Sequence, residues 1–123
     1  KGQAAMKYAV LVYESPEQVK LRQDPQRGPA YWAAYKAYGQ TLIDSGVAAG
    51  GEGLEPPSSG TTVRVRGSER QVQDGPFAET KELLGGFFLI DVPDLETALV
   101  WASRCPAASS GCVEVRPVLP PIA

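Results

Sequence analysis

The sequence predicts an α+β fold in a single domain, and three observations lead to that class. Short runs rich in β-branched and aromatic residues lie near both ends of the chain and between them, as strands do. Two longer segments carry apolar residues at three-and-four spacing, which is typical of helices. A further segment alternates on both sides of a Gly-Ser pair, which indicates a hairpin.

The first strand is predicted at residues 6–13, which read Met-Lys-Tyr-Ala-Val-Leu-Val-Tyr. Both faces of this run are largely apolar. A strand with solvent on one side should alternate apolar and polar residues, so we expect this strand to be covered on both sides. Residues 14–28 contain two prolines and many polar side chains, and they predict a connecting loop with a short helical turn at 17–21.

The first clear helix is predicted from Pro29 to Ser45, because proline suits a first helical turn and Gly46 is a natural stop. Its predicted apolar face consists of Tyr31, Ala34, Tyr35, Tyr38 and Leu42. At this spacing the tyrosines favour a core face with hydroxyls at its rim over a binding stripe.

A glycine-rich extended segment is predicted at residues 47–54, followed by a polar break at 55–60. Residues 61–66 and 69–73 then alternate about a Gly-Ser turn and predict a hairpin. The arginines of this hairpin fit a solvated face better than a ligand site; they are Arg64, Arg66 and Arg70.

A second strand that is apolar on both faces is predicted at residues 87–92, after a Gly-Gly pair. The next helix is predicted to begin with Asp94 as its N-cap and to end before Pro106. Its predicted apolar face consists of Leu95, Ala98, Leu99 and Ala102. The last strand is predicted at residues 113–118.

This order of elements is the split β-α-β arrangement of the ferredoxin-like class, with an inserted hairpin. In that class the helices cover one face of an antiparallel sheet and leave the other bare. The two strands that are apolar on both faces therefore predict a homodimer that packs sheet against sheet and encloses a small cavity beside each sheet.

Charge and composition bear on the class of protein. Twelve Lys and Arg against fourteen Asp and Glu give a net charge of −2 without a basic stripe, which argues against nucleic-acid binding. No apolar run is long enough to predict a membrane span, and we expect a cytoplasmic protein. Residues 1–5 lack an initiator Met and an apolar signal core, so we expect an expression remnant or disordered tail before one domain at residues 6–123.

The sequence contains no histidine, which excludes Ser-His-Asp and Cys-His nucleophiles and imidazole zinc sites within the chain. Proton transfer would need a carboxylate, Lys, Tyr, Cys or water. No spacing of acidic residues indicates a magnesium cage, so we expect neither a metal nor a cofactor. Cys105 and Cys112 lack the CxxC spacing of a redox pair, and we expect buried thiols.

The most specific run of the chain is Asp74-Gly75-Pro76-Phe77-Ala78-Glu79-Thr80-Lys81-Glu82. In a structural interpretation, Asp74 accepts backbone N–H bonds across a turn, Gly75 takes a positive φ and Phe77 anchors the loop in the core. In a functional one, Asp74 is a catalytic carboxylate beside Lys81 at the mouth of the dimer cavity, and Phe77 is an apolar wall. The residues alone leave both interpretations open.

Other charged groups are candidates for ligand binding. Glu114 and Arg116 share one face of the last predicted strand, and that face lies either in the cavity or in solvent. Glu79, Lys81 and Glu82 fit a solvated face, and their mixed charges also make the loop a candidate lid.

The run at 74–82 is followed by Leu84-Gly85-Gly86-Phe87-Phe88-Leu89-Ile90 and, near the end, by Gly111-Cys112-Val113-Glu114-Val115-Arg116-Pro117. Together these motifs resemble the YCII-related family in its DGPF-domain branch, over most of residues 6–118. The resemblance implies a dimeric α/β barrel of ferredoxin-like subunits. Some family members hold a His and Asp pair in an active site, and a few relatives are dehydrochlorinase-like enzymes. Asp74 matches the Asp of the DGPF motif, whereas the histidine has no counterpart here.

Two main functional hypotheses follow. The first is binding of a small organic molecule in a dimer cavity near Asp74, with lyase-like acid/base chemistry. The second is a non-catalytic binding or regulatory protein that uses the 74–82 loop as an interaction surface; the resemblance implies an association with an extracytoplasmic-function sigma factor. A purely structural dimer is a third hypothesis, and the sequence leaves open whether the chain is an enzyme.

Overall fold

The computed structural model of the chain describes residues 6–78 and 80–121. A four-stranded antiparallel sheet has the order β2-β5-β1-β6, and a separate two-stranded hairpin consists of β3 and β4. The strands are β1 (Met6–Glu14), β2 (Ala48–Gly53), β3 (Thr61–Arg66), β4 (Glu69–Asp74), β5 (Leu83–Val92) and β6 (Cys112–Pro117). The helices are α1 (Pro16–Gln23), α2 (Gly28–Asp44), α3 (Leu95–Ser103) and α4 (Ala107–Ser110), with a 3₁₀ turn η1 (Pro57–Ser59).

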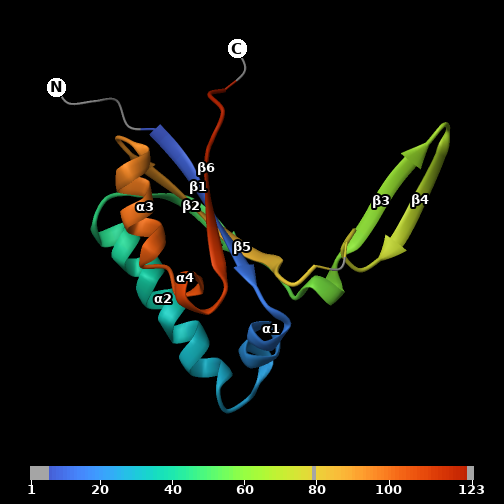
Figure 1. Cartoon of the computed structure of the whole chain (residues 1–123), viewed down its shortest axis with the longest axis horizontal. Helices are drawn as coiled ribbons and strands as arrows, with labels where there is room; N and C mark the ends of the chain where they lie inside the picture. Colours follow the sequence, from blue (N-terminus) through green and yellow to red (C-terminus); the bar gives the residue numbers. More distant parts are fainter. Residues whose placement is uncertain (1–5, 79, 122–123) are drawn as a thin grey trace.

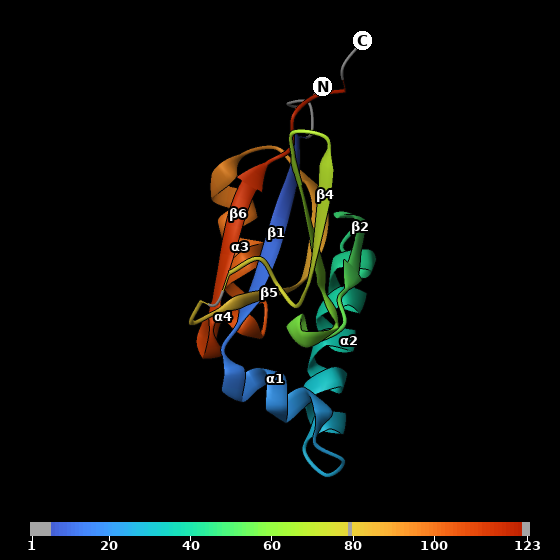
Figure 2. The same ribbon diagram turned by 90° about the vertical axis from the view of Figure 1, so that its right-hand side faces the viewer.

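The arrangement confirms the predicted α+β class and is compatible with a ferredoxin-like fold. The two strands expected to be apolar on both faces, β1 and β5, are the central pair of the sheet. Helices α2 and α3 lie on one side of this sheet, and the β3–β4 hairpin projects away on the other side (Figures 1 and 2). The layers are therefore helices, sheet and an outlying hairpin.

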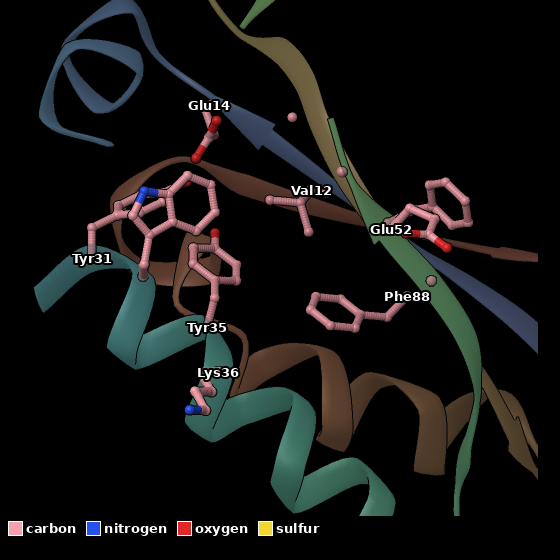
Figure 3. Close-up of a pocket in the computed structure, with 13 residues that line it drawn as sticks. Val12, Glu14, Tyr31, Tyr35, Lys36, Glu52 and Phe88 are labelled. Carbon is pink, nitrogen blue, oxygen red and sulfur yellow. The ribbon is translucent and has the colours of Figure 1, made fainter. Parts of the chain in front are cut away.

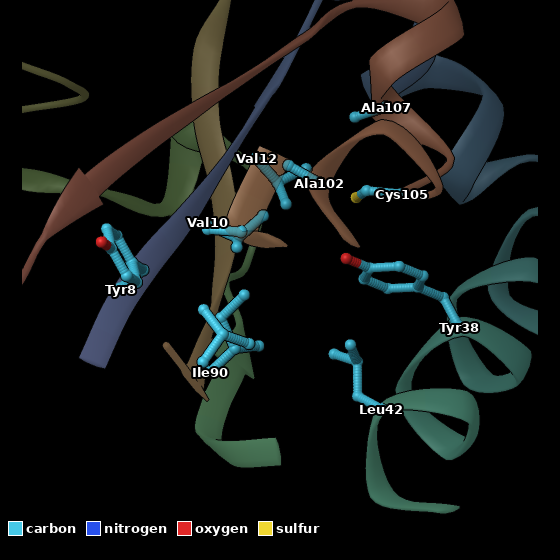
Figure 4. Packing of buried hydrophobic residues seen from close by; sticks show 11 residues of the cluster. Tyr8, Val10, Val12, Tyr38, Leu42, Ile90, Ala102, Cys105 and Ala107 are labelled. Carbon is cyan, nitrogen blue, oxygen red and sulfur yellow. The ribbon is translucent and has the colours of Figure 1, made fainter. Parts of the chain in front are cut away.

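The core lies between the sheet and the helices (Figure 4). It consists of Tyr8, Val10, Val12, Tyr38, Leu42, Ile90, Val92, Ala98, Ala102, Cys105 and Ala107. Tyr38 donates a hydrogen bond from its hydroxyl to the Trp101 carbonyl at 2.8 Å. The predicted core role of the α2 tyrosines holds best for this residue, because Tyr38 is buried whereas Tyr31 and Tyr35 are only partly covered.

The opposite face of the sheet carries no helix in the part of the chain that is described, and we call it the open face (Figure 2). Its centre is apolar, since Ala9 pairs with Leu89 and Leu11 pairs with Phe87, all of them half-buried. Strand β6 adds Glu114 and Arg116 beside these residues. A single chain thus leaves a partly apolar sheet surface uncovered.

Three boundaries differ from the predictions. Residues 16–23 form helix α1 rather than a loop with one turn, because Ser15 caps it: its hydroxyl accepts a hydrogen bond from the Gln18 N–H at 3.3 Å, and Pro16 occupies the first turn. Strand β5 begins at Leu83 rather than residue 87, since Leu83, Leu84 and Gly86 pair with β1, and Gly86 also pairs with β2. Helix α4 was not predicted and spans a single turn.

Helix α3 uses a narrower face than predicted. Ala98 and Ala102 are buried, whereas Leu95 and Leu99 are 48% and 44% exposed. In α2, the predicted face member Ala34 is also exposed. Periodicity located both helices but could not decide how far each apolar stripe extends under the sheet.

The hairpin packs little against the rest of the chain (Figure 1). Val63, Val65 and Val72 lie on one of its faces and are 55%, 61% and 56% exposed, respectively. The interpretation of the hairpin arginines as solvated holds for Arg66 and Arg70, while Arg64 is partly covered. An isolated two-stranded hairpin is marginally stable in water, so this one is a surface that is suited to further packing.

Candidate functional site

The 74–82 loop begins with a backbone turn at Gly75, which has the predicted positive φ, 89°. The Gly75 N–H donates to the Gly60 carbonyl at 2.7 Å, and the Thr62 hydroxyl donates to the Gly75 carbonyl at 2.9 Å. The turn is therefore held to the segment that precedes the hairpin. No hydrogen bond of the Asp74 side chain is present within the described ranges, so the bonds to Gly60 and Thr62, not the Asp74 carboxylate, fix this turn.

Phe77 does not anchor the loop in the core, as the structural interpretation predicted. Its side chain is 75% exposed, because the loop runs outside the sheet layer. It instead forms part of the wall of an open cavity of about 720 Å³. This cavity, which we call the loop cavity, is lined by Tyr13, residues 54–57, 59–62 and 75–78, Thr80 and residues 82–84.

Asp74 and Lys81 lie next to the loop cavity but do not line it. Both side chains are exposed, and Asp74 sits at the end of β4 opposite Thr61. Among the ion pairs of residues 6–78 and 80–121, none joins Asp74 to Lys81. Glu79, a member of the predicted lid, lies outside the described residues.

A row of polar side chains runs from the loop cavity onto the open face. Tyr13 and Glu82 line the cavity. The Tyr13 hydroxyl lies 3.5 Å from Glu114 Oε1, and Arg116 Nη2 lies 2.6 Å from Glu114 Oε2. The predicted pair of Glu114 and Arg116 therefore faces the open side of the sheet, with side chains 42% and 64% exposed, and reaches the cavity only through Tyr13.

Cys112 belongs to the same row and is exposed, contrary to the expectation of two buried thiols; Cys105 is buried as expected. The Cys112 thiol donates to Glu82 Oε1 at 3.1 Å, and this hydrogen bond raises the pKa of Cys112 above its ordinary value. A raised pKa keeps the group a neutral thiol near pH 7, so its environment does not favour a nucleophile.

A second cavity, of about 360 Å³, lies on the helix side of the sheet, between the start of α2 and the edge formed by β2 and β5 (Figure 3). We call it the Glu14 cavity. It is lined by Val12, Glu14, Tyr31, Trp32, Tyr35, Lys36, residues 51–53 and residues 85–88. The sequence interpretation did not identify it.

Glu14 is the central polar group of this cavity and is only 3% exposed. Its Oε1 lies 2.8 Å from Arg22 Nη1, and Arg22 also donates to the Leu54 carbonyl. Oε2 of Glu14 is buried without a hydrogen-bond partner, the one such side-chain atom in the part of the chain that is described. One signal for Glu14 was present: it continues the buried alternation of Tyr8, Val10 and Val12.

The aromatic side chains of α2 surround this ion pair. The Arg22 guanidinium lies over the Trp32 ring at 4.8 Å, and Trp32 Nε1 donates to the Arg22 carbonyl at 3.0 Å. Burial raises the pKa of Tyr35 well above its ordinary value, so this hydroxyl stays protonated and neutral. Nothing in this surrounding supplies a donor to the second Glu14 oxygen among the described residues.

No group of three or more His, Cys, Asp or Glu side chains with the geometry of a metal site occurs within residues 6–78 and 80–121. Over the same residues, none of the helices is long and apolar enough to span a membrane.

Comparison with known sequences gives two matches. Residues 6–121 match the sequence model of the YCII-related domain. An uncharacterised protein of Rhizobium meliloti (strain 1021) is 36% identical over 115 residues, which cover 92% of each chain.

Proposed function

Because the chain belongs to the YCII-related domain family, we propose that it is a DGPF-type member that binds a small organic molecule in the loop cavity and acts as a homodimer. The observation that carries this proposal is the loop cavity itself. The 74–82 loop forms one wall of a space of about 720 Å³, within the range of small-molecule sites. The most specific run of the sequence is thus also a cavity wall.

A second copy would complete this site. The loop cavity is open, and the apolar centre of the open face lies uncovered beside it. Sheet-on-sheet packing would bury Leu11 and Phe87 and close the solvent side of the cavity. It would also give the exposed valines of the hairpin a surface to pack against.

Acid/base chemistry of a lyase type would fall to carboxylates, since the sequence contains no histidine. Glu82 lines the cavity, and Asp74 directly precedes Gly75, which also lines it. Closure by a second copy would bring the Asp74 carboxylate into a less solvated environment, where a general base is more effective. Lys81, Glu114 and Arg116 would then supply charges for an acidic or polar ligand.

The alternative function is regulatory, with the 74–82 loop and the hairpin as an interaction surface for an extracytoplasmic-function sigma factor. The exposure of Phe77 and of the hairpin valines supports it, since contiguous exposed apolar side chains mark interaction sites.

The two functions are separated by a thermal-shift screen of metabolites on the purified chain, followed by two variants. For a ligand in the loop cavity, Phe77→Ala should weaken binding by about tenfold, since an aromatic wall is lost. Val65→Ala is the matched control, because Val65 is similarly exposed but lies outside the cavity.

Asp74→Asn tests the acid/base role. This variant should lower turnover of a substrate while leaving its binding nearly unchanged.

Ligands that bind Phe77→Ala as tightly as the parent chain would place the site elsewhere and contradict the proposal. A screen without ligands, together with co-purification of a sigma factor that is lost in Phe77→Ala, would favour the regulatory function instead.

A further inference from the structure

The Glu14 cavity is hollow because glycines replace side chains on its sheet wall. Gly86 of β5 pairs with Gly53 of β2 on one side and with Val12 of β1 on the other. These positions belong to the helix side of the sheet, as does the pair of Gly51 and Phe88. At Gly51 a side chain is impossible: φ is 137° and an added Cβ would lie 2.5 Å from the Phe87 carbonyl oxygen. The sheet thus leaves a permanent space opposite α2.

The buried carboxylate of Glu14 gives this space a specific polar demand. A buried acceptor without a donor is costly to the fold, and folded proteins retain few of them. Arg22 satisfies one oxygen only: its Nη1 donates to Glu14 Oε1, and its second terminal nitrogen, Nη2, donates to the Leu54 carbonyl. Figure 3 shows the Glu14 carboxylate at the cavity, directed toward the α2 side chains. A ligand that donates one hydrogen bond would satisfy the remaining oxygen.

The walls determine the rest of the ligand. Tyr31 and Tyr35 on α2 lie across the cavity from Phe88 on β5 (Figure 3). Trp32 of α2 is a fourth aromatic residue of the lining. Aromatic walls favour a planar, largely apolar molecule. A cationic ligand is disfavoured, because the Arg22 charge already pairs with Glu14 and lies over Trp32 at 4.8 Å. A volume of about 360 Å³ suits a molecule of one or two rings.

We propose that the Glu14 cavity is a second binding site, separate from the loop cavity, for a small neutral aromatic molecule that donates an N–H or O–H hydrogen bond to Glu14. The site requires no second copy of the chain, since its lining comes from α2, β1, β2 and β5 of one chain. It therefore does not depend on the function proposed above.

Matched probe pairs test the hydrogen bond: indole against 1-methylindole, and phenol against anisole. Each pair has nearly the same ring but only one member has a donor. We expect indole and phenol to shift the amide signals of Gly53 and Gly86 and the Trp32 indole signal in ¹⁵N-edited NMR titrations. Their affinities should exceed those of the methylated partners by about fivefold to a hundredfold.

Two substitutions in β2 test the location. Gly53→Val places a side chain where nothing lies within 4 Å of the added Cβ, at an ordinary φ, so it should narrow the cavity without strain and weaken probe binding by about tenfold or more. Ala48→Val is the matched control: it adds the same side chain to the same strand outside the cavity lining and should leave binding unchanged. Phe77→Ala should also leave it unchanged, because Phe77 belongs to the loop cavity.

Glu14→Gln should remove the preference for donor probes, because its amide can donate as well as accept. Should this variant fail to fold, Gly53→Val still decides, since it retains the ion pair of Glu14 and Arg22. Equal affinities within both probe pairs would overturn the hydrogen bond to Glu14. Probe affinity that is unchanged in Gly53→Val, or no shift at Gly53 and Gly86 with millimolar indole and phenol, would overturn the site.

Discussion

Both members of the ion pair of Glu14 and Arg22 are buried, with side chains 3% and 5% exposed, respectively. Such a pair contributes little net stability, because the cost of removing two charges from water offsets their attraction. Removing only one partner lowers the stability of the fold, since the other charge then stays buried and uncompensated. The two residues therefore constrain each other although they lie on different elements, β1 and α1.

We predict that Arg22→Met lowers the free energy of unfolding by about 3–5 kcal/mol, because it leaves the Glu14 charge unpaired. The double variant Glu14→Leu/Arg22→Met should recover most of this loss. Urea unfolding followed by circular dichroism measures both. Arg27→Met is the control, since its ion pair with Asp24 is long, 4.0 Å, and exposed, and its loss should cost less than about 1 kcal/mol. Similar losses in the two single variants would contradict the prediction.

At the scale of elements, side-chain capping explains where helices α1 and α3 begin. Helix α3 starts at Asp94, whose Oδ1 accepts hydrogen bonds from the Thr97 hydroxyl at 2.7 Å and the Thr97 N–H at 2.8 Å. These two bonds, the hydroxyl first, hold the pKa of Asp94 below its ordinary value. The sequence predicted this cap correctly, whereas the equivalent Ser15 cap of α1 was missed among prolines and charged residues.

The Asp94 cap makes a pH-dependent contribution to stability. Because its pKa is lower in the folded state than the unfolded value of 3.8, the contribution is complete above about pH 4 and is lost as the pH falls through the folded pKa. We expect Asp94→Asn, which keeps a capping oxygen but does not ionise, to lose less stability than the parent chain between pH 4 and pH 2. Parallel acid-unfolding curves for the two proteins would contradict this.

The β3–β4 hairpin shows what residue alternation can and cannot predict about an element. Its alternation and its Gly67 turn, with φ of 63°, were predicted correctly from residues 61–73. Alternation alone did not tell whether the valine face would be covered, and Val63, Val65 and Val72 are exposed because the hairpin pairs with no other strand among those described. Which face of an element is covered depends on its neighbours, which periodicity does not contain.

At the scale of the whole molecule, the open face is the partly apolar sheet surface that the single chain leaves uncovered. We predict that the protein sediments as a dimer and that Leu11→Lys, at the centre of this face, weakens self-association by about tenfold or more. Leu99→Lys is the matched control, because Leu99 is 44% exposed on α3, on the opposite side of the sheet. A parent chain that stays monomeric at high micromolar concentration would contradict the sheet-to-sheet dimer.

The two candidate sites differ in how far they could be predicted from the sequence. The turn at the start of the 74–82 run was predicted because it is a local feature, and part of this run forms a wall of the loop cavity. Asp74 and Lys81, which were expected to lie beside each other at a cavity mouth, do not line the loop cavity. The Glu14 cavity was missed because its ion pair joins β1 to α1 and its sheet wall is formed by glycines of two strands that are distant in sequence.

The sequence by itself determined the α+β class, the order of the strands and of helices α2 and α3, and the turn at Gly75, since each depends on local propensity, alternation or backbone freedom. The tertiary structure alone decided which alternating residues became core, the exposure of Phe77 and the union of Glu14 with Arg22. Those outcomes depend on strand register and on the packing of helices against one face of the sheet, and both are set by contacts between residues far apart in the chain.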